Sequence, residues 1–485
     1  MKSINKIAVL GTGIMGSQIA AHLSNAGYNV LAFDMTQEIA EKGIETSTRI
    51  KPKAYYNPKS TSLITILNYE DHLAELSKCQ WVVEAITERL DWKLDLYKKI
   101  IPHLNDDVIL TSNTSGISAE ELSSGLSDDL RTRFFITHFC NPPRYMKLVE
   151  IIPNSYTDQK YIDAIIPVLE EGLGKGVVYA NDTPNFIANR IGVYSMMVTL
   201  EEAAKRSLSI EDVDGLTGSL IGHPKSATYR TADVVGLDTL AFVAQNAYNK
   251  CPDDPERDIF QIPDYLQKMI NNGWLGQKSG QGFYKKISKG VIHSINSQTL
   301  DYHPQNKKRY PGVRVARQFT NLKKRIDELC NSADISGEFT WSVTARALIY
   351  SAGLIGVAAK DIVNIDNAMK WGFGWELGPF EIWDALGVRS SVEKMKDEGL
   401  TIPYWVNSML DNGCDSFYCI QDGTLKYFDA IESEYKEIPS HNKAFSFHII
   451  KAYAGTIRKS LSASLVDLGD GIAGIEFLYA LTPAL

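Results

Sequence analysis

The stretch Ile7–Gly16 reads IAVLGTGIMG and decides the fold of the first part of the chain. Its four leading apolar residues predict a buried strand, and Gly11, Gly13 and Gly16 follow with the spacing G-x-G-x-x-G. In such a motif the first glycine permits a tight turn, the second lets the backbone approach a pyrophosphate, and the third lets helix and strand pack closely. The helix that follows offers free N–H groups and a partial positive charge. The stretch therefore predicts a dinucleotide site.

Asp34 ends the next apolar run, Val30–Phe33. A carboxylate about 20 residues after the glycines accepts hydrogen bonds from a ribose diol and repels a 2′-phosphate, so NAD is favoured over NADP. Further apolar runs lie at Trp81–Val83, Val108–Thr111 and Phe134–Thr137, with helical patterns between them. This alternation predicts an α/β Rossmann-type, doubly wound sheet.

The composition of the chain narrows the class of protein. Its 485 residues are 44% hydrophobic and 22% charged, which is ordinary for a soluble protein of several domains. The net charge of −8 argues against broad binding to nucleic acid or anionic membranes. The six cysteines have no metal-site spacing, so we expect reduced thiols and no metal. The apolar start could be a secretion signal, but its glycine spacing favours a strand and turn, and we expect a cytoplasmic protein without a membrane span.

From Asn185 onward the pattern becomes helical, beginning with a long amphipathic segment at Ile187–Ser207. A weak internal repeat follows, which predicts two duplicated all-α domains. The first copy contains Ile210-Glu211-Asp212, Gly222-His223-Pro224 and DVVGL at 233–237, and the second contains Ile365-Asp366-Asn367, Gly378-Pro379-Phe380 and DALGV at 384–388. The polar stretch Ser288–Asn321 indicates a linker or surface loop. Asp422-Gly423 predicts a tight hairpin turn between two short strands.

These patterns divide the chain into four expected parts. Residues 1–183 form the nucleotide-binding domain, 184–290 the first helical domain, 291–455 a linker and the second helical copy with a hairpin insertion, and 456–485 a tail.

His138 is the candidate base, because it lies at the carboxyl end of a predicted strand, where ligands bind in open α/β sheets. Histidine suits proton transfer near neutral pH. The prolines after Asn141 break the strand, and Met146–Ile152 is expected to return alongside it, which can bring Glu150 beside His138. Such a carboxylate fixes the histidine tautomer and stabilises the imidazolium. Taken alone, His138 is more often a structural histidine.

Two neutral side chains complete the candidate site. Ser115 follows the strand Val108–Thr111, and its hydroxyl can bond a substrate oxygen, although one of the serines at 112–118 is expected to cap the next helix. Asn189, one turn into the helix after Pro184, can support the same oxygen from the other side or make an interdomain hydrogen bond.

At this point the chain resembles the L-3-hydroxyacyl-CoA dehydrogenases. The resemblance is carried by GTGIMG, VVEAITE, SNTS, HFCNP with MKLVE, DTPNFIANR and GQKSGQGFY, over residues 1 to about 285. It implies NAD-dependent oxidation of an (S)-3-hydroxyacyl-CoA to the 3-ketoacyl-CoA in fatty-acid β-oxidation. The family's catalytic groups fall on His138, Glu150, Ser115 and Asn189. Its cofactor contacts fall on Gly11, Gly13, Gly16, Asp34, Glu88, Lys93 and Asn141.

The chain departs from the family at Asn185, where the family usually has glycine, but asparagine tolerates unusual backbone angles. Residues 463–477 resemble the start of a crotonase-type hydratase domain, which suggests the dehydrogenase part of a longer bifunctional enzyme. We therefore expect no hydratase activity from this chain, and a missing hydratase domain or a thiolase as possible partners. The second helical copy can supply the packing that pairs two chains elsewhere in the family, so a monomer is favoured over a dimer.

The sequence leaves two other functions open. The chain could be a dehydrogenase of a free β-hydroxy acid or sugar acid. It could also be a non-catalytic NAD-binding scaffold, although a scaffold has no need of all four candidate catalytic groups. The preferred acyl length, the coenzyme A contacts and domain closure are not indicated by the sequence.

Overall fold

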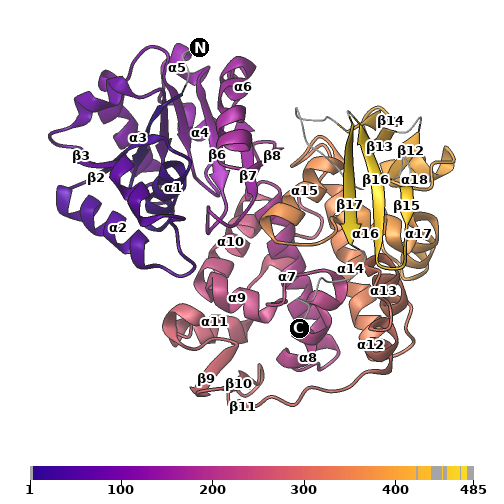
Figure 1. The fold of residues 1–485 in the computed structure, drawn as a ribbon. Helices are drawn as coiled ribbons and strands as arrows, with labels where there is room; N and C mark the ends of the chain where they lie inside the picture. Colours follow the sequence, from indigo (N-terminus) through magenta and orange to yellow (C-terminus); the bar gives the residue numbers. More distant parts are fainter. Residues whose placement is uncertain (1–3, 422–423, 439–450, 452–455, 470, 478–485) are drawn as a thin grey trace.

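The computed structural model describes residues 4–421, 424–438, 451, 456–469 and 471–477. Its first part is an eight-stranded sheet with the order β3-β2-β1-β4-β5-β6-β7-β8 (Figure 1). The strands are β1 Lys6–Leu10, β2 Asn29–Asp34, β3 Ile64–Asn68, β4 Trp81–Glu84, β5 Ile109–Ser112, β6 Phe134–Phe139, β7 Leu148–Pro153 and β8 Gly176–Tyr179. Strands β1 to β6 pair in parallel, which confirms the predicted Rossmann-type sheet.

Strand β7 runs antiparallel to β6, with His138 directly opposite Glu150. This confirms the predicted return of the chain after Asn141. The short strands β3 and β8 were not predicted. The helices of this part are α1 Ile14–Asn25, α2 Gln37–Arg49, α3 Leu90–Ile100, α4 Ala119–Ser123, α5 Asp128–Arg131 and α6 Gln159–Pro167.

The sheet is buried on both faces, which explains its continuous apolar runs. Ala8 and Leu10 of β1 pack into one apolar cluster, while Ile7 and Val9 pack into another. All four side chains are fully buried. Because successive side chains of a strand point to opposite faces, helices must cover the sheet on both sides.

The rest of the chain contains two groups of helices (Figure 1). The first group is α7 Ala188–Lys205, α8 Ile210–Leu216, α9 Tyr229–Val235, α10 Leu237–Lys250 and α11 Asp264–Asn271. The second is α12 Pro311–Ala316, α13 Leu322–Cys330, α14 Ile335–Gly353, α15 Ile362–Gly372, α16 Pro379–Leu386, α17 Val388–Asp397 and α18 Tyr404–Asp411. Both belong to the large apolar cluster that also covers one face of the sheet.

The two groups repeat one arrangement of buried carboxylates. Asp233 accepts hydrogen bonds from the N–H groups of Phe283 and Tyr284, each at 2.8 Å. In the second group, Asp384 accepts from the N–H groups of Phe417 and Tyr418 at 2.7 and 2.9 Å.

Each copy has a second carboxylate, and its partner shows which residues of the two copies correspond. Asp214 accepts from the Tyr284 hydroxyl at 2.7 Å, and Asp366 accepts from the Tyr418 hydroxyl at 2.8 Å. The partner of Asp366 is therefore Asp214, not Glu211. Residues 233–237 and 384–388 are matched correctly. The strings that contain Glu211 and Asp366 were aligned three residues out of register.

The stretch Ser288–Asn321 is not the plain loop that its polarity suggested. It contains β10 Val291–Ile295 and β11 Tyr302–Pro304, which form a small sheet with β9 Tyr284–Ser288, and it ends beyond α12. The Ser294 hydroxyl and the Asn306 N–H both bond Glu211 of α8, at 2.7 and 2.8 Å. These contacts with α8 give the polar residues of this stretch fixed partners.

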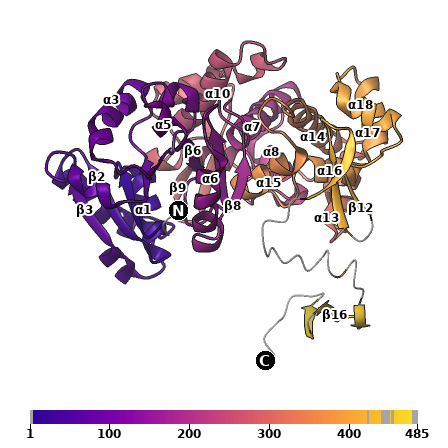
Figure 2. The ribbon, with the colours of Figure 1, turned by 90° about the horizontal axis from the view of Figure 1, so that it is seen from above.

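Two small sheets follow α18. β12 Tyr418–Gln421, β13 Thr424–Asp429 and β14 Glu434–Glu437 form one, in which Gln421 pairs with Thr424 as expected for a hairpin. The turn residues 422–423 lie outside the described residues. β15 Thr456–Lys459, β16 Ala463–Gly469 and β17 Ile472–Phe477 form the other, and Figure 2 shows it apart from the helices. In the described part of the chain, no helix has the length and apolar character needed to cross a membrane.

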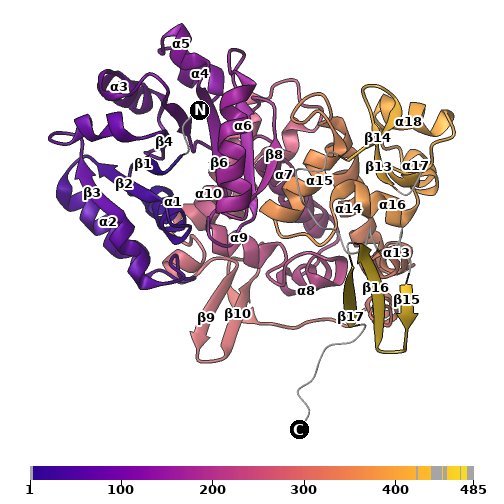
Figure 3. The ribbon, with the colours of Figure 1, turned by 45° about the horizontal axis from the view of Figure 1, so that its top comes forward.

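The second helical group contacts both preceding parts. Helix α14 packs along α7, where the Tyr194 and Tyr350 rings stack with their centroids 3.7 Å apart. Helix α15 packs against α7, β7 and β8, and Figure 3 shows it beside α7 and β8. Helix α15 therefore supports β8, the edge strand, and β7, which carries Glu150.

Candidate active site

His138 and Glu150 form the centre of the candidate site. They lie opposite each other on β6 and β7, and His138 Nδ1 is 2.6 Å from Glu150 Oε2. Glu150 is fully buried and His138 is 6% exposed. A proton on Nδ1, shared with the carboxylate, leaves Nε2 with a free lone pair. The arrangement can therefore accept a proton at Nε2 and stabilise the resulting imidazolium.

The other oxygen of Glu150 connects the sheet to the first helical copy. Glu150 Oε1 accepts hydrogen bonds from the N–H groups of Ile187 and Ala188, each at 3.0 Å. Ala188 is the first residue of α7, so the carboxylate lies at the positive end of a long helix. The carboxylate of Glu150 therefore joins β7 to the start of α7.

Ser115 lies in the loop after β5, and three other segments hold this loop. Glu88 Oε1 accepts from the N–H groups of Ser115 and Gly116 at 2.9 and 3.0 Å. Asn113 Oδ1 accepts from the N–H of Phe139 at 2.8 Å, which ties the loop to the strand of His138. Lys250 Nζ of α10 donates to the Gly116 carbonyl at 3.0 Å. Ser118 caps α4, as expected of one serine in this stretch.

Asn113 and Lys250 were not identified from the sequence. Asn113 belongs to the quoted SNTS string, so the string marked its position but not its contact. Nothing in the sequence near Lys250 indicates that α10 reaches the Ser115 loop.

Asn189 is the second residue of α7 rather than one turn into it. The chain reaches this helix through Asn185 and Phe186, which have φ angles of 65° and 51°. Left-handed backbone is tolerated by asparagine better than by most residues, which explains why Asn185 can stand where the family usually has glycine. The Asn185 amide also donates to the Val243 carbonyl at 2.9 Å and accepts from Asn246 at 2.8 Å.

The glycine turn has the geometry that a dinucleotide requires. Gly11 has a φ of +96°, and a Cβ on Gly16 would lie 1.9 Å from the Gly11 carbonyl oxygen. A Cβ on Gly13 would meet no atom within 4 Å, and no side chain caps α1 there. The N-terminus of α1 is therefore open to a pyrophosphate.

Asp34, the expected ribose contact, also holds this turn. Its Oδ2 accepts from the Thr12 N–H at 2.7 Å and the Thr12 hydroxyl at 2.8 Å, and its Oδ1 accepts from the Met35 N–H at 2.8 Å. A carboxylate has about four acceptor sites, so some capacity remains for a diol. Asn141, also an expected cofactor contact, accepts from Gln18 of α1 at 3.2 Å and so lies beside the same helix.

Lys93 has a structural partner that the sequence did not indicate. It is 1% exposed, and its Nζ donates to the fully buried Glu84 at 2.6 Å. Glu84 also accepts from the Ser112 hydroxyl at 2.6 Å, which joins the ends of β4 and β5. Lys93 Nζ is 3.6 Å from Glu88, so it lies near the Ser115 loop. Its contact with the cofactor stays a prediction.

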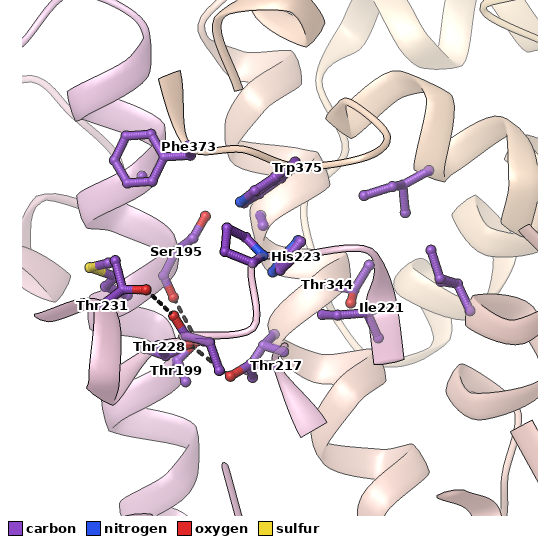
Figure 4. A pocket seen from close by; sticks show the side chains of 18 of the residues that line it. Ser195, Thr199, Thr217, Ile221, His223, Thr228, Thr231, Thr344, Phe373 and Trp375 are labelled. Atoms are coloured by element: carbon purple, nitrogen blue, oxygen red, sulfur yellow. Dashed lines mark hydrogen bonds between the residues drawn. The ribbon is translucent and has the colours of Figure 1, made fainter. Parts of the chain in front are cut away.

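A separate cavity of about 70 Å³ lies between the two helical copies. Figure 4 shows the His223 and Trp375 rings facing each other beside it, with ring centroids 4.1 Å apart. The hydroxyls of Thr217 and Thr228 bond each other at 2.9 Å in its wall. None of the four candidate catalytic residues lines this cavity. Among the described residues, no cluster of three or more histidine, cysteine, aspartate or glutamate side chains could hold a metal ion.

Comparison with known proteins assigns the nucleotide-binding part and the first helical group. Residues 6–183 match the family described as 3-hydroxyacyl-CoA dehydrogenase, NAD binding domain, and residues 186–286 match its C-terminal domain. A probable 3-hydroxyacyl-CoA dehydrogenase of Bacillus subtilis is 44% identical over 98% of this chain, and the chain spans 62% of that relative's length. The crystal structure of 3-hydroxybutyryl-CoA dehydrogenase from Escherichia coli K12 has the same fold over 85% of this chain and 99% of its own, with a TM-score of 0.62 and 20% identity.

A shorter relative is matched over most of its length. The probable 3-hydroxyacyl-CoA dehydrogenase of Deinococcus radiodurans is 42% identical over 58% of this chain and 83% of the relative. On these matches and on the NAD-binding fold, the chain belongs to the 3-hydroxyacyl-CoA dehydrogenase family.

Proposed function

We propose that this chain oxidises an (S)-3-hydroxyacyl-CoA to the 3-ketoacyl-CoA with NAD, as a step of fatty-acid oxidation, and that His138 is the base. The observation that carries the proposal is the 2.6 Å contact of His138 Nδ1 with the buried Glu150, at the carboxyl end of β6. The names of the Bacillus subtilis and Deinococcus radiodurans relatives support the reaction class. Fold and NAD binding alone would not distinguish this substrate from other alcohols.

In the proposed reaction, Nε2 of His138 accepts the proton of the substrate hydroxyl as the carbon loses hydride. Glu150 keeps the second ring proton on Nδ1 and stabilises the positive ring. Ser115 and Asn189 bond the substrate oxygen as it becomes a carbonyl. NAD, when bound, supplies the hydride acceptor. Gly11, Gly13 and Gly16 would hold its pyrophosphate, and Asp34 its adenosine ribose.

The test is a His138→Gln variant assayed with 3-hydroxybutyryl-CoA. We expect kcat to fall by about 10²–10⁴-fold, the usual contribution of an acid–base group, while NADH binding is retained. His103→Gln is the matched control. His103 ends a short helix, Ile101–His103, that leads into β5, so it lies near the amino ends of the parallel strands and away from His138. A His138→Gln enzyme with the parent's turnover would exclude His138 as the base.

The same assay separates the alternative functions. Turnover of free 3-hydroxybutyrate, faster than that of its coenzyme A thioester, would favour a dehydrogenase of free acids. Binding of NADH without turnover of either compound would favour a scaffold. A hydratase domain or thiolase as partner remains a prediction, and so does the absence of hydratase activity.

A further inference from the structure

Lys175 is a buried lysine that the proposed reaction does not use. It lies between two glycines at the start of β8, and the residue is 5% exposed. Its N–H donates to the Leu169 carbonyl at 2.8 Å. Gly174 has a φ of +66°, and a Cβ on Gly176 would lie 2.3 Å from the Trp371 ring. The glycines therefore let this segment take a path that directs the lysine side chain inward.

The Lys175 ammonium contacts backbone carbonyls instead of a carboxylate. Nζ donates to the carbonyl of Pro143 and, at 2.8 Å, to that of Met146. It also lies 5.8 Å from the centroid of the Phe139 ring. None of the ion pairs in the described part of the chain includes Lys175. Burial of a charge without a counter-ion is costly, so the two carbonyls are a specific compensation.

Both carbonyls belong to the turn that joins β6 to β7. Within this turn, the N–H groups of Tyr145 and Met146 donate to the Pro142 carbonyl at 2.9 and 3.0 Å. The turn sets the register in which His138 lies opposite Glu150. A slip of one residue would move Glu150 to the other face of the sheet, so the pair depends on the shape of the turn.

We propose that Lys175 is a positioning residue for the proposed reaction: its ammonium clamps the Pro143 and Met146 carbonyls and thereby holds Glu150 in line with His138. The inference rests on the proposed function, since it concerns the same pair of side chains. We expect the same clamp to hold Asn141 in place, because Asn141 begins the turn and lies beside α1.

The groups around the clamp make its protonation sensitive to pH. Burial lowers the pKa of Lys175 from 10.5 to about 8. His22 of α1 faces the same region, and burial together with Lys175 lowers the pKa of His22 to about 3. Burial and the Glu150 charge raise the pKa of Cys140 well above its usual range, and Arg144 adds positive charge from the turn. At neutral pH, the Lys175 ammonium is thus charged. Its hydrogen bonds to the Pro143 and Met146 carbonyls weaken above about pH 8, where the ammonium loses its proton.

The experiment compares Lys175→Met and Lys175→Arg with Lys147→Met, which removes an exposed lysine next to the same turn. The first measurement needs no turnover: hydrogen–deuterium exchange of the amides at 140–147. Charge-assisted hydrogen bonds are strong, so exchange of Tyr145 and Met146 should speed up by about tenfold or more in Lys175→Met. Lys175→Arg and Lys147→Met should exchange like the parent.

The second measurement is the pH profile of kcat. The parent should lose activity above about pH 8, where the Lys175 pKa lies. Lys175→Met should have a kcat about ten- to a hundredfold lower, with little change in KM and without this alkaline limb. Arginine keeps its charge, so Lys175→Arg should restore most of the rate and move the limb to higher pH.

Two outcomes would overturn the proposal. One is parental exchange in Lys175→Met. The other is a loss of kcat that still begins near pH 8 in Lys175→Arg. This second test can be made even if Lys175→Met does not fold. Hydrogen–deuterium exchange does not depend on turnover. A His138→Gln enzyme with parental activity would therefore contradict the proposed function, while the exchange result would still test whether Lys175 holds the turn.

Discussion

Replacement of Glu150 by glutamine tests the candidate pair most directly, because it keeps the size of the side chain and removes its charge. In the parent, one carboxylate oxygen accepts two N–H groups of the α7 start at 3.0 Å, and the other meets His138 Nδ1 at 2.6 Å. A glutamine has only one oxygen. Two backbone donors hold that oxygen more strongly than one ring N–H, so we expect the amide NH₂ to face His138.

An amide donor next to Nδ1 reverses the tautomer of the histidine. Nδ1 must then accept, so the ring proton moves to Nε2, which can no longer take a proton from the substrate. Loss of the orienting carboxylate in comparable acid–base sites costs about 10³–10⁴-fold in kcat, or roughly 4–5.5 kcal/mol of activation free energy. Binding of NADH should be unaffected, since no expected cofactor contact bonds Glu150.

The assay is the steady-state formation of NADH from 3-hydroxybutyryl-CoA, together with NADH binding followed by fluorescence. The double variant Glu150→Gln/His138→Gln is the control. Residues that act as one unit are not additive, so the double variant should be no slower than His138→Gln alone. Parental kcat in Glu150→Gln, with the fold intact, would refute the idea that this carboxylate sets the tautomer.

Four further outcomes are expected. Gly16→Ala should abolish NADH binding and lower Tm, because its Cβ would lie 1.9 Å from the Gly11 carbonyl oxygen; unchanged binding in a titration would contradict this. Asp34→Ser should narrow the preference for NAD over NADP by about tenfold or more, as measured by the ratio of kcat/KM values, since it removes charged hydrogen bonds and repulsion of the 2′-phosphate. The pKa of Lys175 is about 8 in the folded protein, below its ordinary value of 10.5, so the unfolded chain binds more protons between these pH values. The free energy of unfolding should therefore rise with pH in this range, and denaturant titrations should find this rise missing in Lys175→Met. The chain should sediment as a monomer, because α7 already packs against α14 of the same chain, and an obligate dimer would show this reasoning to be wrong.

Local sequence pattern was sufficient to predict most strands and the glycine turn of the nucleotide-binding part. The apolar runs are continuous because both faces of the sheet are buried, and Gly11, Gly13 and Gly16 mark a turn that few other residues can form. Two prolines after Asn141 were enough to predict the return of the chain and the meeting of His138 with Glu150. Strands β3 and β8 were not predicted, although they are as long as β1, β4 and β5, which were.

Contacts between distant segments could not be predicted in the same way. The alignment of the helical repeat depends on which buried carboxylate bonds each tyrosine, and Asp214 and Asp366 do not stand in matching strings. The stretch 288–321 was expected to be a plain loop because its residues are polar, yet several of them bond α8.

The sequence by itself was sufficient to predict the class of fold, and to mark the expected dinucleotide site and the candidate base. Each depends on a short run of residues whose backbone or side-chain chemistry is restrictive. Only the tertiary structure decided that the N–H of Ala188, the first residue of α7, bonds Glu150. It also decided that Lys250 of α10 bonds the Ser115 loop, and that Lys175 bonds the turn between β6 and β7. Hydrogen bonds between segments far apart in the chain depend on how the elements pack, and a lysine between two glycines looks the same in sequence whether its ammonium meets water or two buried carbonyls.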